Sequence, residues 1–171
     1  MIKLIFKIFA VLFAIILLVT AIFYLYASSS RYPEDSYSSF SSQKQSVGQQ
    51  DTLSVVTYNM GYLSGMSNNL PIATTRSFYK NNEDSLIYFL ETIKPDIVAL
   101  QEIDFDSERS YNVDQLAIIA EGTQLQNTAK AVNWDKKYVP FPYWPVSNHF
   151  GGILSGQAVA SHFSILETKS V

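Results

Sequence analysis

An amide and a carboxylate close two strand-like runs in this sequence. Asn59 is the last residue of LSVVTYN, residues 53–59, and Glu102 is the last residue of DIVALQE, residues 96–102. A helix-like segment lies between the runs, so we predict two parallel strands joined by a right-handed crossover. Open α/β sheets place their sites where the carboxyl ends of parallel strands meet, so the two side chains could share a pocket. The simpler interpretations are a turn residue for Asn59 and a solvated strand end for Glu102.

Three acidic residues at alternate positions follow the second run. Asp104, Asp106 and Glu108 are spaced like the start of a calcium-binding loop, but the glycine and the distal glutamate of such a loop are absent. We therefore predict that these carboxylates lie in a solvated loop rather than in a metal site.

A stretch rich in proline and aromatic residues, residues 135–150, contains Tyr143 and Trp144. Aromatic rings of this kind can stack on a base or contact lipid. They also pack well inside proteins, and packing is the interpretation that we favour. The stretch is predicted to form a loop over an edge of the sheet.

The composition excludes several classes of function. The 171 residues include no cysteine, which excludes disulfide scaffolds, zinc sites built on cysteine and a thiol nucleophile. Only two histidines are present, so a histidine-rich metal site is excluded as well. The chain has 12 Lys+Arg against 15 Asp+Glu, a net charge of −3. Strong binding to nucleic acid through phosphate contacts is therefore not expected.

The N-terminal segment is predicted to cross a membrane. Residues 8–27 carry no charge, and a helix of that length rises about 30 Å, the thickness of the hydrocarbon core of a bilayer. Lys3 and Lys7 precede the segment, which favours a single-pass protein with its N-terminus in the cytoplasm and the rest outside. A cleaved signal peptide that ends near Ala27 is the alternative, and it also places the remainder outside the cytoplasm.

The rest of the chain divides into a linker and a domain. Residues 28–50 are dominated by serine and glutamine and are predicted to form a flexible tether. Residues 51–171 show the periodicity of an α/β domain. Its further elements are predicted to be helices over 83–94 and 112–121, with Gly122 as a C-cap, and strands over 128–134, over 157–162 and from 165 onward.

Three motifs in this domain resemble the endonuclease/exonuclease/phosphatase family, in its membrane-anchored bacterial form. They are LSVVTYNMGYL, KPDIVALQEID and SGQAVASHFSI, and they occur in the order of the family, with similar elements between them. The resemblance covers residues 51–171. The third motif departs from the family pattern at Ala160, Ser161, His162 and Ser164.

The resemblance implies a four-layer α/β sandwich and the metal-dependent cleavage of phosphoesters. Carried over by position, Glu102 would ligate Mg²⁺ (or Mn²⁺), and Asn59 would form a hydrogen bond near the metal or the phosphate. Arg109 becomes a candidate contact to the substrate phosphate. His149 and His162 do not stand in the Ser-Asp-His context of the family, so we interpret both as structural or incidental. Whether the substrate is a nucleic acid, a lipid or a small phosphoester stays open.

The second half of the family pattern is missing from this sequence. Family members carry an Asp-x-Asn segment and a final Asp-His pair, which orient or activate the attacking water, and neither occurs here. Residues 51–171 therefore correspond to the N-terminal half of such a domain. We expect the chain on its own to be inactive and poorly soluble. A membrane-tethered binding module without catalysis, or a gene relic, is the alternative to an enzyme.

Overall fold

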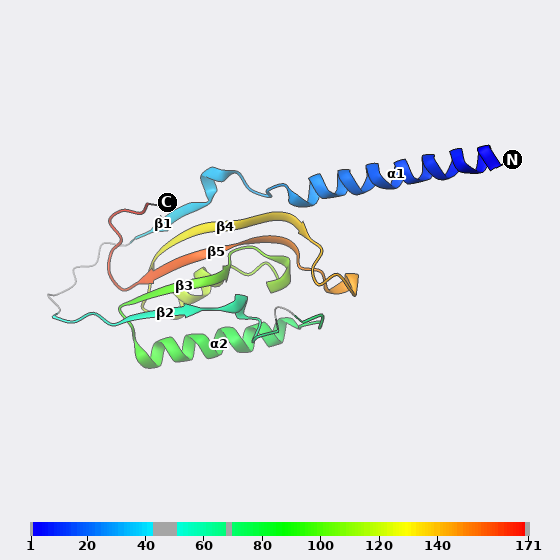
Figure 1. The fold of residues 1–171 in the computed structure, drawn as a ribbon. Helices are drawn as coiled ribbons and strands as arrows, with labels where there is room; N and C mark the ends of the chain where they lie inside the picture. Colours follow the sequence, from blue (N-terminus) through cyan, green and yellow to red (C-terminus); the bar gives the residue numbers. More distant parts are fainter. Residues whose placement is uncertain (1, 43–50, 68–69, 170–171) are drawn as a thin grey trace.

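A five-stranded mixed sheet with helices packed against it forms the body of the protein, and a long apolar helix leads into it (Figure 1). The computed structural model describes residues 2–42, 51–67 and 70–169. This arrangement is α/β, as predicted. The main elements, in chain order, are α1 (Ile2–Ser28), β1 (Ser38–Ser41), β2 (Val55–Asn59), α2 (Arg76–Ile93), β3 (Ile97–Asp104), α3 (Gln115–Gly122), β4 (Asn127–Val139) and β5 (Gly151–Ser161).

The strands lie in the order β1-β4-β5-β3-β2. β2 and β3 are parallel and put Asn59 opposite Gln101, which confirms the predicted parallel pair, whereas every other pair is antiparallel. We expected the run 53–59 to be buried on both faces, and this is wrong. β2 is an edge strand, so only Val56 turns into the core, and the other four residues of the strand are exposed.

Helix α2 begins earlier than the predicted start at residue 83. The Thr75 side chain accepts a hydrogen bond from the amide of Phe78 and caps the helix, so the acidic residues near 83 lie in its middle. The predicted end is confirmed, because Lys94 takes a left-handed conformation as the C-cap. Leu86 and Leu90 face the core.

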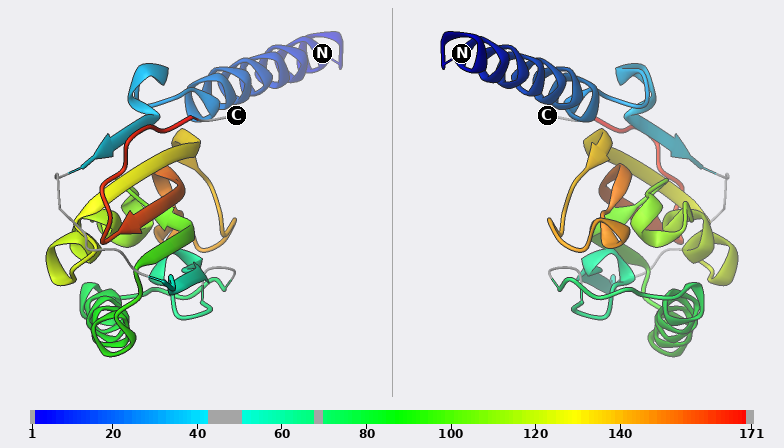
Figure 2. Two further views of the ribbon diagram at one scale, coloured as in Figure 1. Left: turned by 90° about the vertical axis from the view of Figure 1, so that its left-hand side faces the viewer. Right: turned by 90° about the vertical axis from the view of Figure 1, so that its right-hand side faces the viewer.

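Helix α3 begins three residues later than the predicted start at residue 112. The Asp114 carboxylate accepts hydrogen bonds from the amides of Leu116 and Ala117, which makes Asp114 the N-cap. Leu116 and Ile119 pack into the same core as Leu90 of α2. Figure 2 shows α2 on the side of the body opposite α1.

Strands β4 and β5 are about twice as long as predicted. β4 has 13 residues and takes the first five positions of the stretch 135–150 that we expected to be a loop. Irregularities in the β4–β5 register, between Val132 and Trp134 and between Lys136 and Val139, interrupt the alternation by which sequence patterns reveal strands. The described residues 162–169 contain no strand, so the one expected from residue 165 is not found there.

The first part of the predicted flexible linker is bound to the sheet. β1 pairs with β4, and the backbone amides of Arg31 and Tyr32 donate to the Asp135 carboxylate at 2.8 and 2.9 Å. Tyr37 donates its hydroxyl hydrogen to the same carboxylate at 2.8 Å. Arg31 also forms an ion pair with Asp106. These contacts, which we call the Asp135 clamp, fix the chain between α1 and β1, and residues 43–50 of the predicted linker lie outside the described part.

Helix α1 is long and apolar enough to cross a membrane. It has 27 residues, its most apolar window has a mean hydropathy of 3.0, and none of that window is buried in the protein. An uncleaved anchor and a signal sequence both have this length and composition.

One carboxylate at the amino end of β3 is expected to make stability depend on acid pH. The backbone amide and then the hydroxyl of Ser54 donate to Asp96, each at 2.8 Å, and these bonds lower the pKa of Asp96. A lowered folded-state pKa stabilises the protein above the pKa of the unfolded chain, and this stability is lost as pH falls through the folded pKa. In Ser54→Ala the pKa of Asp96 should rise towards its usual value, measured by NMR titration of the carboxyl carbon. Ser85→Ala, an exposed serine of α2 that makes no contact with Asp96, is the control, and an unchanged Asp96 titration in Ser54→Ala would contradict the assignment.

Candidate functional site

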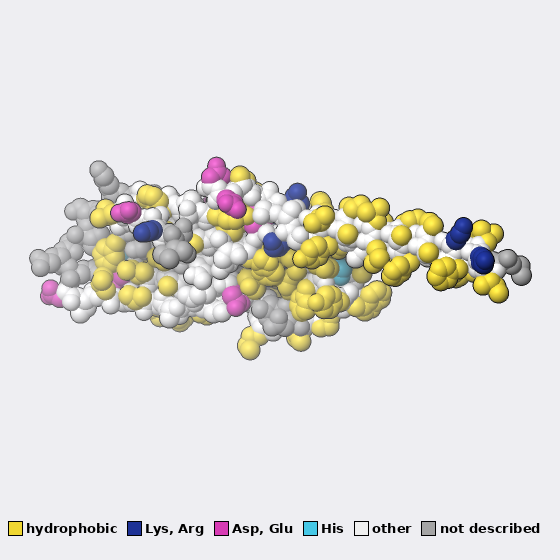
Figure 3. Space-filling view, turned by 45° about the horizontal axis from the view of Figure 1, so that its top comes forward, with side chains coloured by type: hydrophobic (Ala, Val, Ile, Leu, Met, Phe, Trp, Pro, Cys, Tyr) yellow, Lys and Arg dark blue, Asp and Glu magenta, His cyan; other side chains and the backbone are white. Residues whose placement is uncertain are grey.

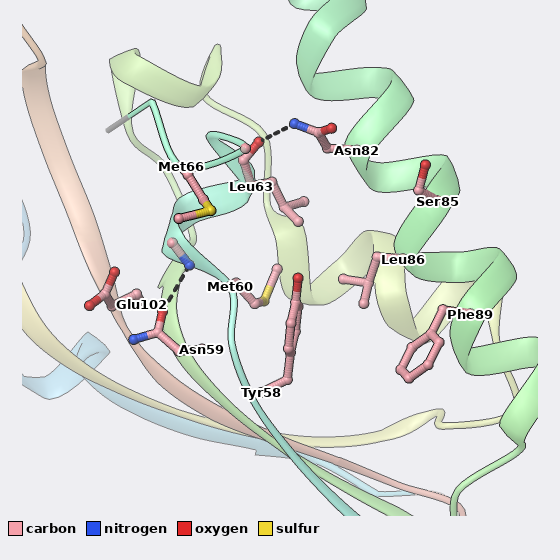
Figure 4. Close-up of a pocket in the computed structure, with 12 residues that line it drawn as sticks. Tyr58, Asn59, Met60, Leu63, Met66, Asn82, Ser85, Leu86, Phe89 and Glu102 are labelled. Carbon is pink, nitrogen blue, oxygen red and sulfur yellow. Dashed lines mark hydrogen bonds between the residues drawn. The ribbon is translucent and has the colours of Figure 1, made fainter. Parts of the chain in front are cut away.

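The structure brings Asn59 and Glu102 together at the carboxyl ends of the parallel strands. Both line a cleft of about 670 Å³ that runs between β2 and α2 (Figure 4). Both also line a second groove of about 240 Å³, whose other residues come from β3, β4, β5 and the turn after β2. The two side chains therefore line both hollows, and the predicted shared pocket at the carboxyl ends of the parallel strands is confirmed.

The backbone presents Glu102 in an unusual way. The β3–β5 register shifts between Gln101 and Ile103, so Glu102 is the extra residue of a β-bulge, with a φ of +50°. Leu100 and Ile103 are both buried, although residues three apart in a regular strand face opposite sides. The bulge thus keeps these two apolar side chains in the core and leaves Glu102 free to line the pocket. A left-handed glutamate costs backbone energy, and such strain clusters at functional sites.

The amide of Asn59 has a defined orientation. Its Oδ1 accepts a hydrogen bond from the backbone amide of Gly61 at 2.9 Å, so Oδ1 is fixed on that side and Nδ2 turns the other way. Figure 4 shows the nitrogen of this amide on the side of Glu102. Asn59 therefore offers a hydrogen-bond donor next to the carboxylate.

The turn after β2 forms a wall of the second groove. Gly61, Tyr62 and Leu63 all have positive φ values, an arrangement that is rare outside glycine. The Tyr62 ring lies on the Arg109 guanidinium, with 3.3 Å between the guanidinium carbon and the ring centroid. Burial raises the pKa of Tyr62, and the opposing effect of Arg109 is smaller.

Arg109, the predicted phosphate contact, lines neither of the hollows at Asn59 and Glu102. It binds Asp104 through two hydrogen bonds, Nε to Oδ2 at 3.0 Å and Nη2 to Oδ1 at 2.8 Å. The side chains of Arg109 and Asp104 are 4% and 0% exposed. Arg109 instead borders a separate cavity of about 210 Å³ together with His149. In this structure, then, Arg109 holds the Tyr62 wall in place from behind.

The expectation of a solvated acidic loop after β3 is wrong for two of its three residues. Asp104 is buried against Arg109, and Asp106 is half-buried between Arg31 and Tyr32. Only Glu108 is exposed. Arginine side chains supply the compensation that these carboxylates need, from Arg109 five residues away for Asp104 and from Arg31 in the N-terminal part of the chain for Asp106.

The two histidines occupy places away from Asn59 and Glu102. His149 shares a hydrogen bond of 2.7 Å with the Tyr138 hydroxyl through Nδ1, and the rings are in contact. The backbone amide of His162 donates to the Asp96 carbonyl at 2.9 Å. Neither ring lines the cleft or the groove at the candidate site.

The donor chemistry of the pair fits a hard divalent cation that is only partly held by protein. Glu102 supplies a carboxylate, and no hydrogen bond or ion pair engages it within the described residues. Those residues contain no group of three or more His, Asp or Glu side chains that could hold a metal ion. Mg²⁺ is commonly bound through one or two carboxylates, with waters and substrate phosphate as the remaining ligands, so one carboxylate is compatible with it.

Comparison of the chain with protein-family models, with curated proteins and with solved structures finds no match.

Proposed function

We propose that the chain is a membrane-tethered phosphoesterase-like hydrolase that depends on a divalent metal, related to the endonuclease/exonuclease/phosphatase family. One observation carries the proposal: Asn59 and Glu102 converge at the carboxyl edge of β2 and β3, with Glu102 presented by a strained bulge. Parallel strands of α/β proteins place functional groups at this edge. The resemblance of the two strand motifs to the family supplies the reaction class.

The two side chains have different roles in this proposal. Glu102 would hold Mg²⁺ or Mn²⁺, which polarises the phosphoryl oxygen and stabilises the leaving oxygen when bound. Asn59 would donate a hydrogen bond from Nδ2 to a phosphoryl oxygen, because its Oδ1 is engaged by Gly61. Tyr62 would limit the width of the groove, with Arg109 behind it. Arg109 is thus a positioning residue rather than a phosphate ligand.

The open face of the sheet supports the four-layer arrangement of the family. α2 and α3 contribute to a core on one face, whereas the register aligns Thr57, Ala99, Val159, Ala129 and Phe40 across the sheet in a row on the other face. Phe40 and Val159 in this row are exposed. We propose that a second sheet packs on this row, as in the sandwich that the resemblance implies.

The substrate would be a small phosphoester or a lipid head group. From residue 51 onward the sequence has 8 Lys+Arg and 13 Asp+Glu, which argues against long DNA as a substrate.

Single-pass insertion through α1, with the body outside the cytoplasm, follows from the lysines that precede the apolar segment.

Hydrolysis of bis(4-nitrophenyl) phosphate by the membrane-inserted chain tests the proposal. Activity that requires Mg²⁺ or Mn²⁺ and disappears with a chelator would support an enzyme and would contradict the expectation that the chain is inactive on its own. Saturable Mn²⁺ binding without turnover would support the metal site and agree with that expectation. The alternative is a membrane-tethered binding module, which the largely apolar wall of the 670 Å³ cleft favours. A module of this kind would bind a ligand there without releasing nitrophenol and without any need for metal.

Asn59→Asp is expected to weaken phosphate binding while the local turn stays intact. Aspartate keeps an oxygen that can accept from the Gly61 amide, but it cannot donate to a phosphoryl oxygen. A hydrogen bond to a charged group contributes about 1.5–3 kcal/mol, so affinity for a phosphodiester analogue in the presence of Mg²⁺ should fall about tenfold or more. Isothermal titration would measure this. Asn81→Asp, on the exposed side of α2, is the control, and equal affinity in the two variants would remove Asn59 from the site.

A further inference from the structure

We propose that the loop between β4 and β5 lies in the interfacial layer of the same bilayer that α1 enters, as a second membrane contact. The loop, residues 140–150, is called the aromatic loop below. The inference rests on the tethering part of the proposed function and is independent of the metal chemistry at Glu102.

The tip of the aromatic loop exposes large apolar side chains. Tyr143 is 80% exposed, Trp144 is 77% exposed and Val146 is 57% exposed. We expected these aromatic residues to pack against the protein, but both side chains are largely exposed, and Tyr143 makes only an edge-on contact with Phe141, with 5.9 Å between ring centroids. Neighbouring rings of the loop do pack, since Phe141 contacts Phe150 with 5.2 Å between ring centroids. The loop thus has a packed base and an apolar tip that no other part of the described chain covers.

Contacts between α1 and the end of β4 determine at which height along α1 the aromatic loop begins. Phe23 of α1 meets Tyr138 of β4 with 5.8 Å between ring centroids. Phe23 stands five residues before the last residue of α1, which is about 7.5 Å back along the helix axis. The end of β4 therefore reaches beside the apolar part of α1. The aromatic loop begins directly after β4, so it starts at the depth of the membrane-spanning segment.

Hydrogen bonds hold α1 and β4 in this relation. The Lys136 ammonium donates to the Ser28 carbonyl at 2.8 Å, and the Lys137 backbone amide donates to the Ser29 carbonyl at 2.9 Å. The Asp135 clamp fixes the residues that follow. Because these contacts span the exit from α1, the body is not free to swing away from the helix.

The surface at this place has the composition of a membrane interface. In Figure 3, hydrophobic side chains gather on the body beside the base of α1 and continue the apolar surface of the helix. The ammonium of Lys137 lies 5.6 Å from the ring centroid of Tyr26, near the end of the helix. Tyrosine and tryptophan are enriched at the level of lipid headgroups, and lysine there keeps its charge in water. This combination of apolar, aromatic and lysine side chains therefore matches the lipid interface.

The inference places the candidate site on the membrane side of the body. The antiparallel register sets Asp104, near the carboxyl end of β3, beside Ser155 in the first half of β5. The aromatic loop leads into β5, so the loop and the Asn59–Glu102 edge belong to the same end of the sheet. Figure 1 shows this end turned towards α1. A phosphoester presented at the bilayer surface would meet the site from that side.

Site-specific labelling of the full chain in lipid nanodiscs tests the inference. The sequence has no cysteine, so Tyr143→Cys gives a single attachment point for an environment-sensitive nitrobenzoxadiazole dye. Tyr88→Cys is the matched control, because Tyr88 is also a tyrosine, is 76% exposed and lies on α2, on the opposite side of the body. We expect the dye at position 143 to shift to shorter wavelength and to lose most of its emission to lipids with spin labels near the headgroup. The dye at position 88 should respond only to quenchers in water.

The outcomes distinguish the membrane contact of the aromatic loop from the membrane tether through α1. Equal quenching by aqueous iodide at positions 143 and 88, in a chain that floats with the lipid, would overturn the membrane contact and leave the tether intact. Failure of the chain to float with lipid would overturn both. Binding of Mn²⁺ at Glu102, measured on the same full chain, reports on the metal site of the proposed function and does not depend on whether position 143 contacts lipid.

Discussion

Replacement of Arg109 by methionine is expected to destabilise the protein by about 3–5 kcal/mol, because it leaves the buried Asp104 carboxylate without its cation. Ser107 also donates to Asp104 at 2.8 Å, but one neutral hydroxyl does not replace the two charge-assisted bonds from arginine. The stacking of the guanidinium on Tyr62 is lost as well. Urea unfolding of the chain in nanodiscs, followed by tryptophan fluorescence, would measure the change.

A double variant separates the effect of the unpaired Asp104 charge on stability from the effect of the lost packing of Arg109. The double variant combines Asp104→Leu with Arg109→Met, so no charge remains buried in this cluster. Most of the stability that Arg109→Met loses should therefore return. If the double variant is as unstable as Arg109→Met alone, the packing of the guanidinium, rather than the unpaired carboxylate, dominates. An effect below about 1 kcal/mol for Arg109→Met would contradict the burial of the pair, since exposed ion pairs contribute in that range.

Glu102→Gln is expected to abolish saturable Mn²⁺ binding and to lower any metal-dependent hydrolysis on the order of a thousandfold. A bound metal supplies several kcal/mol of charge stabilisation in the transition state, which corresponds to that factor. Glutamine has nearly the same shape and the same backbone preferences as glutamate, so the left-handed bulge should persist. Electron paramagnetic resonance of free Mn²⁺ and a nitrophenol assay would follow the two effects.

Glu91→Gln is the matched control for the metal prediction, because Glu91 is an exposed glutamate on α2. It should leave both Mn²⁺ binding and hydrolysis unchanged. Mn²⁺ binding that survives in Glu102→Gln would remove Glu102 as a ligand, and the binding module would then be the better account.

Local patterns in the sequence predicted the parts of the fold that depend on local rules. β2, α2 and β3 follow from strand propensity, helical spacing and the Lys94-Pro95 helix end, and their order predicted the parallel pair. This topology alone was sufficient to place Asn59 and Glu102 at one edge, and the structure confirms that they share a cleft.

The parts that were not predicted depend on tertiary partners and on backbone irregularities, neither of which local patterns reveal. Asp135 is 104 residues from Arg31, so the composition of residues 28–42 indicated a tether, whereas the clamp binds them to β4. Asp104 was predicted to be solvated because its cluster has only part of a calcium-loop pattern, whereas the structure pairs it with Arg109, which was identified as a substrate contact. Tyr62 was missed as a wall of the site, and its only local signal is the preceding Gly61, which permits the left-handed turn. Bulges hid the true lengths of β4 and β5.

The Asp135 clamp also determines how the protein can search for what it binds. A body on a flexible tether of 23 residues would sample a hemisphere above the bilayer and reach soluble molecules and lipids alike. The clamp leaves almost no free chain between α1 and β1, so the body can only spin about the membrane normal and diffuse laterally. Its encounters are then confined to a thin layer of fixed height, in which surface density, rather than bulk concentration, determines the rate. Inserting flexible residues between α1 and the clamp would let the body move away from the bilayer again and reach molecules in bulk solution.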